Sequence, residues 1–180
     1  GRLEDDRTVT VVLTGTALTL DDVVEVARHG ARVELAPEAR ERMAVARDVV
    51  EHSVAEGSVA YGVTTGVGMR KAFAVSDDGH DRLLVRQHLI AQGPEVGHDV
   101  VRATALRLAN ALAQGVTVAR PELAEHVVRR LNADELPPVR ALGSIGQGDL
   151  APMADLAEGL VADFELVQGE AIALVNQNAF

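Results

Sequence analysis

The chain has 180 residues, of which 47% are apolar and 24% charged, and this length and composition suit one domain with a sizeable core. Its 17 basic and 27 acidic residues give a net charge of −10, which argues against nucleic acid, because proteins that bind phosphate backbones concentrate positive charge. The absence of cysteine excludes disulfides and thiolate metal sites, and the six scattered histidines give no reason to expect a metal. The sequence contains no apolar stretch of membrane-spanning length and no signal-peptide pattern at its start, so we expect no membrane insertion and a cytoplasmic location.

The first elements are marked by strong local signals. The segment over residues 8–13 is short and rich in β-branched side chains, which predicts a strand. Thr19 and Asp22 have the spacing of a capping box, and Gly30 is placed to end the helix that they begin. A second helix is predicted over residues 37–57, because it opens on a proline, keeps helical apolar spacing and meets a glycine.

The rest of the chain reads as one glycine-rich loop followed by helices. Residues 58–79 are irregular and predict a long loop. Apolar spacing then predicts further helices over residues 81–91, 99–114, 121–132, 149–160 and 168–175, with a break at the Pro137-Pro138 pair. Asp149 can be the N-cap or a first-turn acid of its helix. Apart from the opening strand, we therefore expect a mainly α fold, in which residues 1–180 form a single domain.

The segment over residues 61–68 reads YGVTTGVG and contains the only tyrosine of the chain. Its glycines permit positive φ and close backbone approach, as in phosphate-binding loops. However, it lacks the Lys-Ser/Thr ending of a P-loop and the strand-to-helix setting of a dinucleotide fingerprint. By itself the pattern leaves open a buried tyrosine that only packs in a loop.

Residues 143–152 read GSIGQGDLAP, and this segment resembles the signature Gly-Ser-(Val/Ile)-Gly-Ala-Ser-Gly-Asp-Leu-Ala-Pro of the histidine/phenylalanine ammonia-lyase family. In that family, Ala-Ser-Gly cyclises and loses water to give the electrophilic group methylidene-imidazolone. Here Gln147 stands in place of Ala-Ser. None of Gly146, Gln147 and Gly148 carries a β-hydroxyl to lose, so we expect no prosthetic group and no cofactor.

The resemblance extends to other segments and implies roles for their residues. The YGVTTGVG segment is similar to the family loop whose tyrosine removes the β-proton of the substrate, so Tyr61 is the candidate base and Gly68 of the same loop a candidate substrate contact. A phenol titrates near 10, so such a base would need neighbouring positive charge or hydrogen bonds. The resemblance also assigns Asp149 to the altered prosthetic-group loop.

Two further candidates lie in helical segments. Residues 83–90 read LLVRQHLI and resemble a family segment whose histidine lines the substrate pocket, which makes His88 its counterpart; a histidine that is merely hydrogen-bonded on an apolar helix is the alternative. Gln87 replaces a family serine and suggests a reshaped pocket. Residues 170–176 resemble the segment that carries an active-site asparagine, matched here by Asn176. Asn110, in another matching segment, is expected to have buried partners and to hold a neighbouring loop in place.

Ordinary members of the family are longer, and their later segments supply a further tyrosine, an arginine for the substrate carboxylate and an acidic residue. Their active sites are shared between the subunits of a tetramer. The resemblance therefore implies an incomplete site here and a complementary C-terminal lyase-like subunit in a hetero-oligomer. A fragment of a longer protein is the alternative explanation.

Three functions follow from these features. The first is an enzyme that dispenses with the electrophile and catalyses a base-driven elimination, addition or cyclisation on a small amino-acid-like molecule or a biosynthetic intermediate. The second is a non-catalytic subunit that completes or regulates a lyase-like partner. The third is an ordinary amino-acid ammonia-lyase that forms its group by other chemistry.

Overall fold

The computed structural model describes residues 9–75, 79–146 and 148–180. Helices dominate it, as predicted, and the strands are short. In chain order the elements are β1 (Thr10–Leu13), α1 (Leu20–His29), β2 (Arg32–Leu35), α2 (Pro37–Ala55), the 3-10 helix η1 (Gly68–Arg70), α3 (His80–Gln87), β3 (Gln92–Glu95), α4 (His98–Leu112), α5 (Pro121–Asn132), β4 (Arg140–Leu142), α6 (Leu150–Leu160) and α7 (Glu170–Val175).

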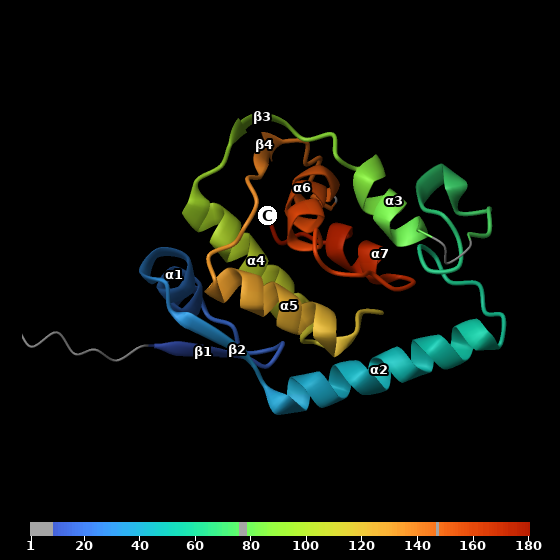
Figure 1. Ribbon diagram of the computed structural model, residues 1–180, viewed down its shortest axis with the longest axis horizontal. Coiled ribbons are helices and arrows are strands. Elements are labelled where there is room, and N and C mark those ends of the chain that lie inside the picture. The colour runs from blue at the N-terminus through green and yellow to red at the C-terminus, as the bar shows by residue number, and fades with distance from the viewer. Residues whose placement is uncertain (1–8, 76–78, 147) are drawn as a thin grey trace, which may run out of the picture.

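Helices α4 and α5 lie at the centre of the molecule (Figure 1). On one side of them lie α1 and the β1–β2 pair, and on the other lie α3, α6 and α7. Almost every residue of α4 from Val101 to Leu112 is buried. Neighbouring elements therefore cover this helix on several sides. Most of the fully buried large side chains are leucines, namely Leu13, Leu84, Leu106, Leu108, Leu112, Leu123, Leu131, Leu156, Leu160 and Leu174.

The predicted helix boundaries follow from local chemistry at the first helices. The Thr19 hydroxyl accepts the N–H of Asp22, and the Asp22 carboxylate accepts the N–H of Thr19 at 2.9 Å, so the capping box is formed. Gly30 ends α1 in the left-handed conformation, at φ 72°. Pro37 opens α2, where its missing N–H leaves no helical hydrogen bond unmade.

Three strands were not predicted. β2 pairs in parallel with β1 over its four residues, and β3 pairs antiparallel with β4. The prediction that α3 continues to Ala91 was therefore wrong: the helix ends at Gln87, and the chain extends to pair with residues 140–142. Such short pairings depend on partners far along the chain, so the local apolar spacing does not show them.

Two asparagines complete the backbone hydrogen bonding of this part of the fold. Asn110 accepts the buried N–H of Gly15 at 3.1 Å, so it holds the segment between β1 and α1, as its sequence context indicated. Asn132 bonds both the N–H and the carbonyl oxygen of Val33, each at 2.8 Å. Its side-chain amide thus takes the place of a neighbouring strand beside β2.

Helix α2 carries the chain from the β1–β2 pair to the segment that contains Tyr61 (Figure 1). Only Ala39, Met43 and Arg47 of this helix are buried. The Arg47 guanidinium donates to the carbonyl oxygens of Val118 and Gln168, each at 2.9 Å. These bonds fasten the middle of α2 to the two segments that lead into α5 and α7.

None of the described helices combines the length and the apolar character that a membrane span requires.

Candidate active site

The segment after α2 folds back on itself to form a compact loop. The N–H of Gly66 donates to the carbonyl oxygen of Phe73 at 3.1 Å, and a bridge joins Thr65 to Ala74. At Gly66 a side chain would lie 2.7 Å from the Arg70 Cβ atom, so only glycine lets the two parts of the loop approach this closely. We call residues 58–75 the Tyr61 loop.

Tyr61 is 54% exposed, so the alternative of a buried, packing tyrosine is wrong. Its hydroxyl oxygen accepts the backbone N–H of Gly68 at 2.9 Å. Gly68 has φ +55°, a conformation that glycine adopts without strain. The loop therefore fixes the phenol oxygen by a main-chain donor and leaves the ring accessible.

The Tyr61 loop docks on α7 next to the tyrosine. A side chain at Gly62 would come within 2.9 Å of Ile172, so the glycine permits direct contact between the loop backbone and the helix. The side-chain amide of Gln168 donates to the carbonyl oxygen of Val63 at 3.0 Å. Together these contacts hold the start of the loop against α7.

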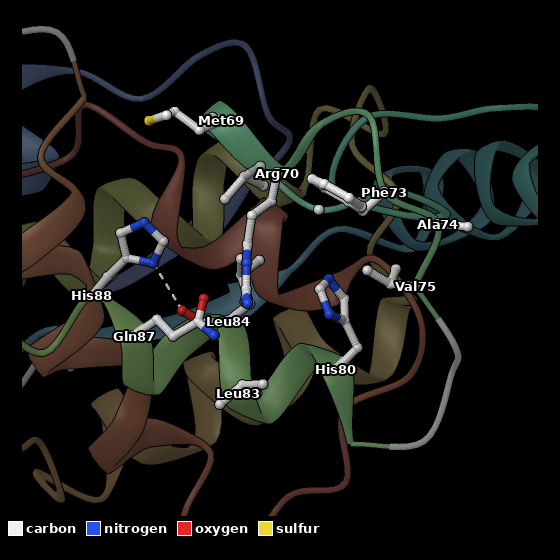
Figure 2. Close-up of a pocket in the computed structure, with 13 residues that line it drawn as sticks. Met69, Arg70, Phe73, Ala74, Val75, His80, Leu83, Leu84, Gln87 and His88 are labelled. Carbon is white, nitrogen blue, oxygen red and sulfur yellow. Dashed lines mark hydrogen bonds between the residues drawn. The ribbon is translucent and has the colours of Figure 1, made fainter.

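A cavity of about 710 Å³ lies between the Tyr61 loop and α3 (Figure 2). The predicted contacts Gly68 and His88 both line it. His88 follows the last residue of α3, and its Nδ1 atom lies 2.8 Å from the carbonyl oxygen of Leu84. His88 is thus hydrogen-bonded to its helix and also part of a cavity wall. The described residues that line it are Gly66, Val67, Gly68, Met69, Arg70, Phe73, Ala74, Val75, His80, Leu83, Leu84, Gln87 and His88.

Residues 143–149 form the segment that the sequence predicts to be an altered prosthetic-group loop, called here the altered loop, and its described residues lie beside the end of α7. The N–H of Asp149 donates to the carbonyl oxygen of Gln177 at 2.9 Å. A side chain at Gly148 would lie 3.8 Å from the Asn176 Oδ1 atom. Gly146 and Gly148 have φ values of +81° and +94°, while the predicted site residue Gln147 lies outside the described residues. The structure therefore brings Asn176 to this loop.

Asp149 occupies the N-cap position of α6, one of its two predicted places. Its carboxylate makes no capping bond to the helix within the described residues. It instead accepts the hydroxyl of Ser144 at 2.6 Å, and the Ser144 oxygen accepts the N–H of Gly146 at 3.2 Å. Asp149 thereby ties the two ends of the altered loop together.

The predicted site residues form two groups, one beside Ile172 of α7 and one at the C-terminal end of this helix. Tyr61, Gly68 and His88 belong to the loop and the cavity wall, and Asn176 belongs with the altered loop. Helix α7 joins the two groups. Ile172 contacts the Tyr61 loop, and Asn176, one turn after it, donates its N–H to the Ile172 carbonyl oxygen. The position of α7 therefore determines the geometry of both.

The residue that anchors α7 was not predicted. Asp81, in the first turn of α3, is buried and accepts the N–H groups of Ala171 at 2.6 Å and Gly169 at 3.0 Å. Burial raises the pKa of its carboxyl, although both backbone bonds lower it. Sequence reasoning found only a polar residue at a helix start, because its partners lie almost ninety positions away.

Asp81 predicts a specific pH dependence of stability. Because its pKa is raised in the folded chain, the stability it contributes is fully present below the ordinary carboxyl pKa and falls as the pH rises through the folded-state value. We expect the stability advantage of the wild type over Asp81→Asn to be largest near pH 4 and to shrink towards pH 7. Urea denaturation of both proteins across this range measures it.

Asp22→Asn is the control, because the stability that Asp22 contributes should change with pH in the opposite direction. The side-chain hydrogen bond from Thr19, followed by its backbone hydrogen bond, lowers the pKa of Asp22. The stability from Asp22 is present above the ordinary carboxyl pKa and lost as the pH falls. The difference in stability between the wild type and Asp81→Asn should not stay constant with pH, and it should not grow with pH as the Asp22 effect should. Either result would contradict the assignment to Asp81.

Known proteins resemble this chain over most of its length. A family model described as aromatic amino acid lyase matches residues 18–176. A histidine ammonia-lyase of Symbiobacterium thermophilum is 42% identical over 164 residues, which are 88% of this chain and 32% of that protein. A histidine ammonia-lyase of Caldanaerobacter subterraneus subsp. tengcongensis is 39% identical over 150 residues, which are 81% of this chain and 30% of that protein. The chain thus spans about a third of the length of these relatives.

The fold is shared with solved structures. The ergothioneine-degrading enzyme ergothionase of Treponema denticola superposes with a TM-score of 0.89 and 26% identity, over 94% of this chain and 39% of that one. The family match covers the Tyr61 loop, the cavity wall, the altered loop and Asn176. The chain belongs to the aromatic amino acid lyase family.

Proposed function

We propose that this chain supplies the proton-abstracting part of a lyase site that works without methylidene-imidazolone. The observation that carries the proposal is Tyr61, an exposed phenol held by the Gly68 N–H at the edge of the cavity that His88 lines. That N–H would stabilise negative charge on the phenol oxygen, as a general base requires. Tyr61 is the base in this proposal, and Gly68, His88 and Asn176 are substrate contacts.

The residues of the altered loop do not fit the family's prosthetic group. Neither Gly146 nor Gly148 has a side-chain oxygen, and the residue between them is a glutamine. The nearest hydroxyl before them, that of Ser144, donates to the Asp149 carboxylate at 2.6 Å. No step of the proposed reaction therefore passes through an electrophile at this loop.

The proposed reaction is a base-driven elimination, addition or cyclisation on an amino-acid-like substrate or a biosynthetic intermediate. In an elimination, the Tyr61 oxygen takes a proton from carbon, the electrons of that C–H bond form a carbon–carbon double bond, and the leaving group departs with its bonding electrons. An ammonium group on an unactivated amino acid leaves poorly. A quaternary ammonium cannot lose a proton and departs as a neutral amine. The Treponema denticola relative is named for degrading ergothioneine, which makes ergothioneine a candidate substrate to test.

We further propose that a complementary C-terminal lyase-like subunit completes the site in a hetero-oligomer. The apolar side chains around the candidate site support this, because such surface is normally covered by a partner. Met69 is 98% and Ile145 82% exposed, one on the Tyr61 loop and the other on the altered loop. Val59, Phe73, Ile90 and Leu142 are also exposed.

Two alternatives have their own support. The change of Ala-Ser to Gln147 favours a non-catalytic subunit that completes or regulates a lyase-like partner. The identity of about 40% to histidine ammonia-lyases favours an ordinary amino-acid ammonia-lyase fragment. The accessible phenol at the cavity favours the first proposal over the non-catalytic one.

Co-expression tests these possibilities. The chain, tagged, is produced together with whichever adjacent reading frame encodes a C-terminal lyase-like segment. The purified material is examined by intact mass and incubated with L-histidine, L-phenylalanine, L-tyrosine and ergothioneine. We expect a co-purifying partner, an unmodified mass and ultraviolet absorbance of an unsaturated acid from ergothioneine only. Loss of water from this chain would support the ordinary lyase, and a partner with no turnover of any probe would support the non-catalytic subunit.

A further inference from the structure

Gln168 lies where four parts of the fold meet. It precedes α7, and its side-chain amide donates to the carbonyl oxygen of Val63 in the Tyr61 loop at 3.0 Å. Its own carbonyl oxygen accepts an N–H of the Arg47 guanidinium on α2 at 2.9 Å. The N–H of the next residue, Gly169, donates to the Asp81 carboxylate on α3 at 3.0 Å. Two consecutive residues therefore connect α2, the Tyr61 loop, α3 and α7 (Figure 1).

The bond from Gln168 to Val63 links the Tyr61 loop to the start of α7. Among the residues that the structure describes, it is the one hydrogen bond that joins this loop to an element other than α2. Val63 is 3% exposed, and a side chain at Gly169 would come within 3.1 Å of it. Gln168 thus bonds to the part of the loop that already packs closely against the chain before α7.

Val63 belongs to the turn that carries Tyr61. The N–H groups of Val63 and Thr64 donate to the carbonyl oxygen of Ala60 at 3.1 and 2.9 Å. The N–H of Ala60 donates to the Thr64 hydroxyl oxygen at 2.8 Å. From this turn the Tyr61 hydroxyl reaches the Gly68 N–H at 2.9 Å. Because the turn is closed by its own hydrogen bonds, a displacement of Val63 would carry the tyrosine with it.

We infer that Gln168 is a positioning residue for Tyr61, because its side chain fixes the turn from which the phenol reaches Gly68. The Arg47 side chain, which is 11% exposed, fixes the main chain of Gln168 from the other side. Gln168 is not among the described residues that line the cavity, so it acts through Tyr61 and not on the substrate. The inference rests on the proposed function, since the place of the phenol affects turnover only if Tyr61 is the base.

The composition of the chain makes Tyr61 directly observable, because there is one tyrosine and no tryptophan. Near-ultraviolet circular dichroism in the tyrosine band therefore reports this phenol alone, and NMR hydrogen exchange reports the Gly68 N–H that it accepts. Gln168→Met keeps the length of the side chain but cannot donate. We expect it to lose most of the tyrosine signal and to speed exchange at Gly68 by about two- to tenfold, as the loss of one hydrogen bond implies.

Gln177→Met is the matched control, because Gln177 also donates its side-chain amide to a backbone carbonyl, that of Ala173 at 2.8 Å, at the other end of α7. It should keep both wild-type signals, and far-ultraviolet circular dichroism should show both variants folded. Unchanged signals in Gln168→Met, or the same changes in Gln177→Met, would overturn the inference.

Turnover of the reconstituted complex separates this inference from the proposed reaction. Gln168→Met should lower kcat by about 10–100-fold and change KM little, as a displaced base implies. The signals of Tyr61 need no turnover. If Gln168→Met changes them while Tyr61→Phe keeps full activity, the positioning of Tyr61 by Gln168 is supported and only the proposed reaction is refuted.

Discussion

Replacing Tyr61 by phenylalanine should lower the turnover of the reconstituted complex by about 10²–10⁴-fold, the contribution of a positioned general base. The ring remains and keeps its place at the cavity edge, while the only group removed is the oxygen that accepts the Gly68 N–H. Substrate contacts are unchanged, so KM should change little and kcat should carry the loss. Steady-state kinetics on the probe turned over by the wild-type complex measure both.

The control for this substitution is Ser58→Ala, which removes a hydroxyl from an exposed residue of the same loop. It should leave kcat unchanged, and both variants should melt close to the wild type because Tyr61 is more than half exposed. Turnover that survives in Tyr61→Phe would refute the role of the phenol as the base. A loss that Ser58→Ala shares would assign the effect to the loop as a whole.

Local sequence signals predicted the parts of the fold that local chemistry determines. The capping box of Thr19 and Asp22, the left-handed Gly30 and the proline at the start of α2 are all present. Each of these depends on residues within one helical turn, so the sequence displays them directly. The strand β2 depends instead on β1, nineteen or more positions earlier, and no local pattern announced it.

The candidate site residues were predicted from family motifs. A motif identifies single residues along the sequence, but it does not show which of them line the same cavity. The motifs indicated His88, which lines the cavity, and Tyr61, whose hydroxyl oxygen accepts the N–H of the lining residue Gly68. They did not indicate Arg70, which lies in an aperiodic loop, or Asp81, whose partners are backbone groups of α7. Charge at a cavity wall and burial of a carboxylate become visible only when distant segments meet.

The ion pair between Arg120 and Glu170 also joins segments that lie far apart in the sequence, and it gives the second large prediction. Glu170 is fully buried at the start of α7, and its Oε1 atom accepts the backbone N–H and the Nε–H of Arg120, each at 3.0 Å. Its Oε2 atom accepts an N–H from the Arg120 guanidinium and the N–H of Val167, also at 3.0 Å. The hydrogen bond to Glu170 is the main reason that the pKa of Arg120 is raised above its ordinary value.

Glu170→Ala should therefore lower the free energy of unfolding by about 3–5 kcal/mol, because it leaves a guanidinium and two backbone N–H groups without their acceptor. The Arg120 side chain is 28% exposed, so partial solvation should keep the loss towards the lower end of that range. Urea denaturation measures it, with Asp99→Ala as the control. That substitution breaks the exposed pair with Arg28 and should cost at most about 1 kcal/mol.

Combining Glu170→Ala with Arg120→Met separates the buried charge from the lost hydrogen bonds. If the unpaired guanidinium causes most of the damage, the double variant should regain part of the stability, since its neutral side chain needs no counter-charge. It should not recover fully, because the N–H groups of residue 120 and Val167 still lack an acceptor. A double variant less stable than Glu170→Ala would show that Arg120 stabilises the fold mainly by packing on Phe164, whose ring centre lies 5.5 Å from its guanidinium carbon.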